Sequence, residues 1–119
     1  MTTQEIANKL VELCRKGDFE KAQNDLFSQD AVSIEQESSP AFEKETKGLP
    51  AIHEKGKKWN SMVQEMHGLT ISDPIVAGNS FALTLHMDIT MKERGHMDMT
   101  ELCVYNVKDG KIISEEFFM

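Results

Sequence analysis

Apolar residues recur every three or four positions in the first half of the chain and at every second position in the second half. The helical spacing predicts three amphipathic helices. The first is capped by Thr2 and closed by Gly17, the second begins at Asp18, and the third begins near Pro50. The lysines of the third helix, Lys55 among them, are expected on its solvated face. The apolar faces consist, in chain order, of Ile6, Leu10, Leu13 and Cys14, of Phe19, Ala22 and Leu26, and of Ile52, Gly56, Trp59, Val63 and Met66.

Alternation of apolar and polar residues predicts the strands. Residues 31–36 form one short strand and residues 43–47 a second, and four more cover residues 69–72, 80–91, 96–107 and 111–119. The pair Asp109-Gly110 between the last two strands is typical of a tight hairpin turn. Three helices followed by antiparallel strands predict an α+β fold, and the length suits a single domain over residues 1–119.

The turns decide which strand side chains share a face of the sheet. If residues 93–94 form the tip of one hairpin, His86 lies opposite Glu101. If residues 109–110 form the next tip, Cys103 lies opposite Glu116. This register makes one face polar, with Thr84, His86, Asp88, Met99, Glu101, Cys103, Tyr105, Ser114, Glu116 and Phe118. It makes the other face apolar, with Leu83, Leu85, Met87, Ile89, Leu102, Val104, Ile113 and Phe117.

Two arrangements of these faces stay open at this point. In the first, the helices cover the apolar face and the polar face meets solvent. In the second, the polar face lines a pocket under the helices and the apolar face packs against a second copy of the chain.

Charge and composition narrow the function classes. The chain has 119 residues, 39% hydrophobic and 28% charged, with a formal net charge of -7. The acidic excess argues against binding to nucleic acid or to an anionic membrane surface. The first residues have no secretion-signal pattern, and no apolar run is long enough for a membrane helix. Cys14 and Cys103 lack metal or redox spacing, so we expect a cytoplasmic protein with reduced thiols.

Two similar triplets, His86-Met87-Asp88 and His96-Met97-Asp98, raise the question of a metal site. In the predicted register His86 and His96 point to opposite faces, so we expect no metal centre that uses both. We also expect no cofactor.

Three motifs carry a resemblance to a known family. The order of elements and these motifs resemble the nuclear transport factor 2-like superfamily, within it the SnoaL-like and ketosteroid-isomerase-like branch, over essentially the whole chain. The resemblance implies a cone-shaped, strongly bent antiparallel sheet that encloses a pocket closed by the three helices, often in a homodimer formed through the outer sheet face. The motifs are Leu26-Phe27-Ser28-Gln29-Asp30-Ala31-Val32, Gly48-Leu49-Pro50-Ala51-Ile52 and Asp109-Gly110-Lys111-Ile112.

The resemblance also implies site residues. The isomerase branch has its general base a few positions after the Asp-Ala of the first strand, where Glu35 stands, and a second acid on the strand before the last hairpin, where Glu101 stands. The tyrosine that this branch has in its first helix is missing here, and the sole tyrosine, Tyr105, shares a predicted face with Glu101. The cyclase branch has its acid in the last strand, where Glu115 and Glu116 are the candidates.

These residues favour proton transfer next to a carbonyl, as in an isomerase, cyclase or dehydratase. Glu35 is then the base, and Glu101 is the hydrogen-bond donor or orients His86, which is itself an alternative acid or base. We expect Trp59, Asp88, Met99, Cys103, Tyr105, Glu116 and Phe118 to line the pocket around a small apolar carbonyl or carboxylate ligand.

Simpler interpretations stay open. His86 and Glu101 can form a plain cross-strand pair, and Glu35 can be the exposed side of an edge strand. The protein is then a non-catalytic ligand-binding protein or a dimeric scaffold. In either case a homodimer is expected through the apolar row of Leu83, Leu85, Leu102, Val104 and Phe117.

Overall fold

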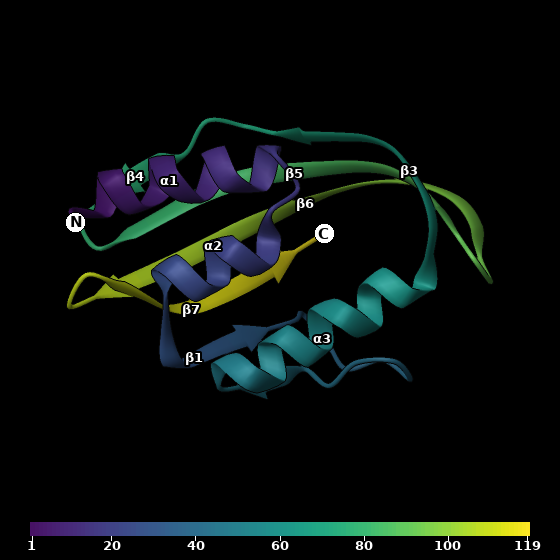
Figure 1. The fold of residues 1–119 in the computed structure, drawn as a ribbon, viewed down its shortest axis with the longest axis horizontal. Helices are drawn as coiled ribbons and strands as arrows, with labels where there is room; N and C mark the ends of the chain where they lie inside the picture. The colour runs from purple at the N-terminus through teal and green to yellow at the C-terminus, as the bar shows by residue number, and fades with distance from the viewer.

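Three helices and seven strands make up the computed structural model, which describes residues 1–119 (Figure 1). The helices are α1 (Thr3–Arg15), α2 (Phe19–Leu26) and α3 (Leu49–Met62). The strands are β1 (Phe27–Ile34), β2 (Glu45–Lys47), β3 (Val63–Ile71), β4 (Ile75–Ala77), β5 (Ser80–Met91), β6 (Gly95–Lys108) and β7 (Lys111–Phe118). No helix is long and apolar enough to cross a membrane.

All seven strands belong to one open sheet. Its order is β2-β1-β7-β6-β5-β3, and the short β4 pairs with β5. The prediction of a purely antiparallel sheet is wrong at one place, because β1 runs parallel to β7. Helix α1 lies along β4 and β5, and α3 lies beside β1 (Figure 1). We call the sheet face that packs against the helices the inner face; it contributes to a core of 23 buried hydrophobic residues.

The predicted signals at the start of the chain are confirmed. The Thr2 hydroxyl oxygen accepts a hydrogen bond from the Glu5 backbone N–H at 3.1 Å, and the Glu5 carboxylate accepts one from the Thr2 N–H at 2.8 Å. Gly17 follows α1 with a φ of 79°, a conformation that glycine adopts readily. Asp18 stands at the start of α2, but its side chain makes no capping hydrogen bond.

The third helix is shorter than predicted. It ends at Met62, and the residues from Val63 to Ile71 form β3. The apolar spacing across Val63 and Met66 fits a helix as well as a strand, but β5 offers a long partner that only a strand can pair with. The connection between the predicted strands 69–72 and 80–91 also contains a short strand, β4.

The predicted register between β5 and β6 is wrong by one residue. Met91, rather than Lys92, lies opposite Gly95, because the loop of the hairpin has three residues instead of two. Gly95 adopts a φ of 75°, the left-handed conformation that closes such a loop. As a result Leu85 lies opposite Glu101, and His86 lies opposite Thr100.

The register between β6 and β7 also shifts, for a different reason. Lys108 lies opposite Lys111, as the Asp109-Gly110 turn predicts, but an irregularity between Asn106 and Val107 adds one residue on β7. Beyond it Cys103 lies opposite Phe117, and Tyr105 lies opposite Glu115.

The two shifts mix the predicted faces. On β5 the apolar residues point inward, and on β6 Met99, Glu101, Cys103 and Tyr105 share that inner face with them. The sheet therefore has neither a purely apolar face nor a purely polar face under the helices, and neither of the two arrangements considered from the sequence is correct as a whole. The inner face also holds Leu83, Leu85 and Phe117 from the predicted outer row, and the outer face holds Thr84, His86, Asp88, Leu102, Val104, Glu116 and Phe118.

Candidate functional site

Polar side chains meet on the inner face where β1, β6, β7 and α3 come together. Strand β1 runs parallel to β7, which places Ser33 beside Glu115. Glu35 follows β1 two residues after Ser33 and points to the same side, and Glu101 lies on the inner face of β6. Lys55 reaches this group from α3. We call these five residues, Ser33, Glu35, Lys55, Glu101 and Glu115, the inner carboxyl cluster.

A chain of hydrogen bonds fixes one side of the cluster. The Lys55 ammonium donates to the Ser33 hydroxyl oxygen at 2.8 Å, and the Ser33 hydroxyl donates to Glu115 Oε2 at 2.7 Å. Ser33 is completely buried and Glu115 is almost so. The Lys55 nitrogen also lies 5.3 Å from the centre of the Phe117 ring, within the range of a cation–π contact.

Glu35 is the unsatisfied member of the cluster. Its Oε2 lies 3.7 Å from the Lys55 nitrogen, is closed off from solvent and accepts no hydrogen bond. A buried carboxylate oxygen without a donor is costly, so such an atom points to a partner that the protein itself does not supply. The Glu35 side chain as a whole keeps 29% of its surface exposed.

Burial raises the pKa of two carboxyl groups into the neutral range. For Glu115 burial raises the pKa to about 7; nearby Glu35 adds to the rise, while the Ser33 hydrogen bond and the Lys55 charge oppose it. For Glu101 burial again comes first, with the charges of Glu35 and Glu115 adding to it, and the pKa is also about 7. A carboxyl group with such a pKa can act as a hydrogen-bond donor or an acceptor near neutral pH.

The other predicted inner residues are buried or partly buried in the core. The Cys103 thiol is completely buried and lies 3.8 Å from Glu101 Oε1. Burial raises the pKa of Cys103, and it raises that of Cys14 to about 12, which disfavours the reactive thiolate form of both. Tyr105 stacks on Phe81 with ring centres 4.9 Å apart, and burial raises its pKa well above the ordinary value. Trp59 and Met99 are partly buried against the core.

The remaining predicted site residues lie outside the cluster. His86 points to the outer face, where its Nε2 lies 2.6 Å from Asp98 Oδ1, so the predicted pair with Glu101 is not formed. Asp88 lies on the same outer face, 2.5 Å from His96 Nε2. Glu116 and Phe118 also point outward, as a result of the shifted register between β6 and β7.

The positions of His86 and His96 also correct the argument made from the sequence against a shared metal site. His86 and His96 share a face instead of pointing to opposite faces. They form two separate pairs with aspartates, and no group of three His, Cys, Asp or Glu residues in the structure is arranged to hold a metal ion.

Sequence reasoning missed the roles of Lys55 and Ser33 and left Glu115 undecided. Lys55 was placed on the solvated face, although it stands three residues after Ile52 and four before Trp59, on the buried stripe itself. Strand alternation places Ser33 on the same side as Glu35, but it gives the serine no role. Glu115 was only one of two candidates in the last strand, because the extra residue on β7 leaves no clear mark in the sequence.

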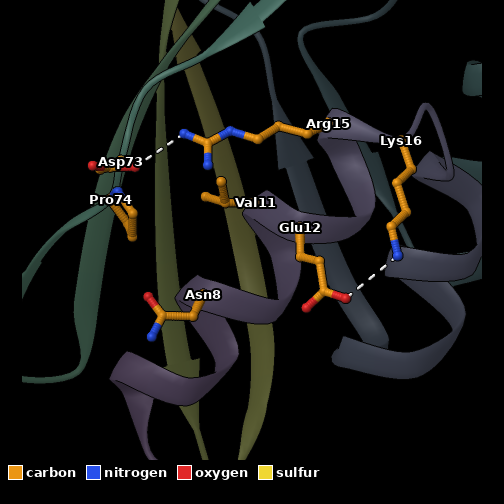
Figure 2. A pocket seen from close by; sticks show the side chains of 7 residues that line it. All are labelled: Asn8, Val11, Glu12, Arg15, Lys16, Asp73 and Pro74. Carbon is orange, nitrogen blue, oxygen red and sulfur yellow. Dashed lines mark hydrogen bonds and ion pairs between the residues drawn. The ribbon is translucent and has the colours of Figure 1, made fainter.

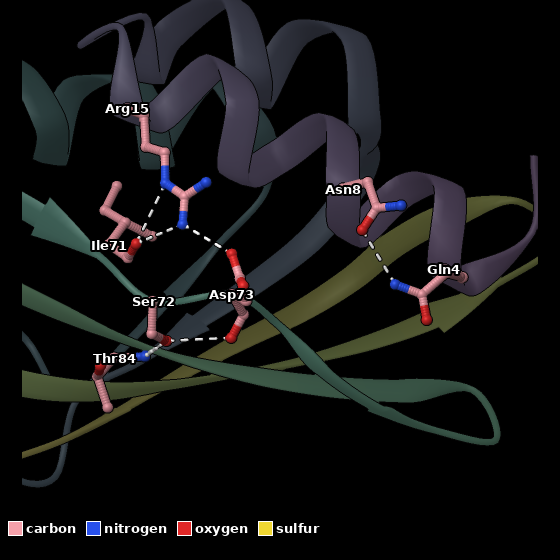
Figure 3. A network of polar contacts seen from close by, with 7 residues as sticks. All are labelled: Gln4, Asn8, Arg15, Ile71, Ser72, Asp73 and Thr84. Atoms are coloured by element: carbon pink, nitrogen blue, oxygen red, sulfur yellow. Dashed lines mark hydrogen bonds and ion pairs between the residues drawn. The ribbon is translucent and has the colours of Figure 1, made fainter.

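A surface depression lies between α1 and the segment at Asp73 and Pro74, apart from the inner carboxyl cluster. Figure 2 shows its lining, which Arg15, Lys16, Glu12 and Asp73 dominate. Arg15 donates to the backbone oxygen of Ile71 at 2.7 and 3.1 Å and to Asp73 Oδ1 at 3.0 Å (Figure 3). These side chains are engaged with one another and with the backbone, and they fasten the end of α1 to the end of β3.

Comparison with known proteins agrees with the fold. The model of the SnoaL-like domain family matches residues 1–119, and the chain belongs to this family. This match confirms the predicted membership in the nuclear transport factor 2-like superfamily. A search of curated proteins gives no match.

Three solved structures are similar to this chain in fold. A candidate SnoaL-like polyketide cyclase from Mesorhizobium loti is 34% identical, with a TM-score of 0.92 and 100% of both chains covered. A candidate isomerase from Bacillus subtilis is 18% identical, with a TM-score of 0.70, 98% of this chain and 88% of that chain covered. A protein with a ketosteroid isomerase-like fold from Catenulispora acidiphila, in complex with trimethylamine, is 19% identical, with a TM-score of 0.70, 99% of this chain and 87% of that chain covered. The predicted α+β fold is confirmed, and its cone shape fits these neighbours.

Proposed function

We propose that this protein binds a small carbonyl compound at the inner carboxyl cluster and moves a proton at the carbon next to the carbonyl group. Glu35 is the general base, and protonated Glu101 donates to the carbonyl oxygen. His86 has no part in the reaction, because it lies on the outer face. The observation that carries the proposal is the pairing of an unsatisfied carboxylate, Glu35, with a second carboxyl group whose pKa burial raises to about 7.

The steps balance without a cofactor. Glu35 takes a proton from the carbon, the C–H electron pair forms a carbon–carbon double bond, and the carbonyl π pair moves onto the oxygen. Return of the proton from Glu35 to another carbon completes an isomerisation; return of that proton to a leaving hydroxyl group on the next carbon, which departs as water while the enolate collapses, completes a dehydration. The same base starts an aldol-type cyclisation when the new carbanion attacks a second carbonyl group of the same molecule.

The charge of the cluster favours a neutral ligand. Three carboxyl groups surround one ammonium group, so the site is negative when the carboxyl groups are ionised. A carboxylate group on a ligand would be repelled there. We therefore propose a neutral carbonyl compound rather than a carboxylate.

Exchange of carbon-bound protons tests the proposal without knowledge of the natural substrate. A panel of neutral cyclic ketones and β-diketones is incubated with the protein in D2O, and loss of the proton signal next to the carbonyl is followed by NMR. We expect Glu35→Gln to slow the catalysed exchange by about 10²-fold or more, which is typical for loss of a general base. Glu54→Gln, an exposed carboxylate on α3, is the matched control and should exchange as the wild type does. No acceleration by the wild-type protein over the panel would refute the proposal.

Binding without chemistry is a second candidate function. The Catenulispora acidiphila neighbour was solved in complex with trimethylamine. With three carboxyl groups against one lysine, the inner carboxyl cluster suits a small organic cation in the same way. Calorimetric titration with trimethylammonium tests this: it predicts saturable binding that Glu35→Gln weakens and Glu54→Gln does not, with no proton exchange in the ketone panel.

A homodimer through the outer face is a separate part of the proposal. Leu102 and Phe118 lie side by side there and are 41% and 37% exposed, with Val104 next to them. Apolar side chains grouped on one sheet face favour contact with another protein surface. Light scattering at micromolar concentration should give twice the monomer mass, and Leu102→Asp should return the monomer. A monomeric wild type would contradict this part.

A further inference from the structure

The one lysine in the inner carboxyl cluster can act as a second donor to the carbonyl oxygen, beside protonated Glu101. We infer that Lys55 is the electrophile of the site: its ammonium group holds the oxygen on which negative charge develops when Glu35 removes a proton from the neighbouring carbon. This inference rests on the proposed function and adds the group that stabilises the enolate.

The ammonium group is fixed in place but not saturated. Ser33 accepts one of its three N–H bonds, at 2.8 Å, and Ser33 is itself held by the buried Glu115. The Phe117 ring lies under the nitrogen at 5.3 Å. The Lys55 side chain is 16% exposed, and no other hydrogen bond from its nitrogen is formed. Two N–H bonds therefore stay free for an oxygen that arrives with a ligand.

The distance between Lys55 and Glu35 fits two neighbouring atoms of one substrate. The nitrogen and Glu35 Oε2 are 3.7 Å apart, too far for a hydrogen bond between them. A carbonyl oxygen bound to the nitrogen places the adjacent carbon within reach of the Glu35 carboxylate. The charge that moves onto the oxygen during proton removal then meets a donor that is already oriented, which is the condition for strong electrostatic stabilisation.

Lys55 is a better candidate for this role than the other groups nearby. The Cys103 thiol already points at Glu101, so it offers no free donor. Glu101 donates only in its protonated form. An ammonium group combines a positive charge with three N–H donors.

Binding of a phenol tests the inference independently of turnover. The probe is para-nitrophenol, whose oxygen becomes negative on ionisation and whose absorbance reports its ionisation state. In the wild-type protein below about pH 7, where Glu101 and Glu115 are largely protonated and only Glu35 opposes the charge of Lys55, we expect the bound phenol to ionise at lower pH than the free phenol. Lys55→Met should remove this shift and weaken phenolate binding about tenfold or more, as expected for loss of a hydrogen bond to a charged group. Lys55→Arg keeps the charge and should retain most of the shift.

Lys57→Met is the matched control, since Lys57 is an exposed lysine of the same helix. It should bind and ionise the phenol as the wild type does. Equal ionisation of the phenol by wild type and Lys55→Met, or no bound phenol at all, overturns the role of Lys55. The two proposals fail separately: proton exchange that depends on Glu35 but phenol ionisation that ignores Lys55 removes only this inference, and the reverse result removes only the catalysis.

Discussion

Replacement of Glu115 by Gln isolates the cost of a buried carboxyl group. Glu115 is only 7% exposed, and burial raises its pKa from 4.5 to about 7. At roughly 1.4 kcal/mol per pKa unit, the ionised group costs the folded state about 3 kcal/mol. Glutamine is neutral at every pH, is close in shape, and still presents an oxygen to the Ser33 hydroxyl, so the variant avoids this cost.

The pKa of Glu115 also fixes the direction of the pH dependence. Because the pKa is higher in the folded than in the unfolded protein, the folded state binds more protons between about pH 4.5 and pH 7. The free energy of unfolding of the wild type therefore falls as the pH rises through this window. Glu101, with a similar pKa, adds to the fall. Relative to the wild type, we expect Glu115→Gln to gain up to about 3 kcal/mol between about pH 5 and pH 8.5.

Urea unfolding at these two pH values, followed by circular dichroism, measures the difference. Glu116→Gln is the matched control, because the neighbouring side chain lies on the outer face. It should follow the wild type at both pH values. If the curves of Glu115→Gln and the wild type stay parallel over the whole window, Glu115 is not the buried group described above, and the electrostatic account of the cluster is wrong.

Three further predictions concern the outer face, the first helix and the thiols. His86→Gln should leave the catalysed proton exchange unchanged, because His86 points away from the cluster; a loss beyond about threefold would restore it to the site. Thr2→Ala should lower the free energy of unfolding by about 1 kcal/mol through loss of the capping hydrogen bond, measured by thermal or urea unfolding, and an unchanged value would contradict the capping box. Cys14 and Cys103 should react with dithionitrobenzoate only after unfolding, because burial raises both pKa values; rapid reaction of the native protein would show that they are accessible.

The order of elements could be predicted because local signals mark it. The capping box of Thr2 and Glu5, the glycine at position 17 and the Asp109-Gly110 turn each act over a few residues, and each is present in the structure. The end of α3 could not be predicted in this way. Val63 leaves the helix to pair with Met91, a residue far along the chain, and that gain is invisible to a local pattern.

The candidate acids Glu35 and Glu101 came from the family resemblance, and the structure brings both to the inner face. His86 and Glu116 were placed by counting across turns, and one extra residue in each hairpin reverses such a count. Lys55 was misjudged because a charged residue on a buried helix stripe is stabilised only by partners, here Ser33 and Glu35, that come from another part of the chain.

The hairpin of β5 and β6 shows which constraint sets the register. A slip of the register by one residue would turn the whole apolar row of β5 outward, and one additional loop residue is enough to prevent this slip. Deletion of Arg94 tests whether the apolar pattern or the loop length determines the register. Met91 can still lie opposite Gly95 across a two-residue loop, so we expect the register to be kept and the strain to fall on the loop.

The expected cost follows from the backbone of such a loop. A two-residue hairpin turn needs positive φ at one or both central positions, which costs about 1–2 kcal/mol for each residue other than glycine. Deletion of Arg94 should therefore lower the free energy of unfolding by about 1–4 kcal/mol, and replacement of the two remaining loop residues by Asn-Gly should restore most of it. If the register slips instead, His86 turns inward and its imidazole becomes protected from diethylpyrocarbonate. Such protection would mean that the turn, and not the apolar pattern, decides which side chains face the cluster.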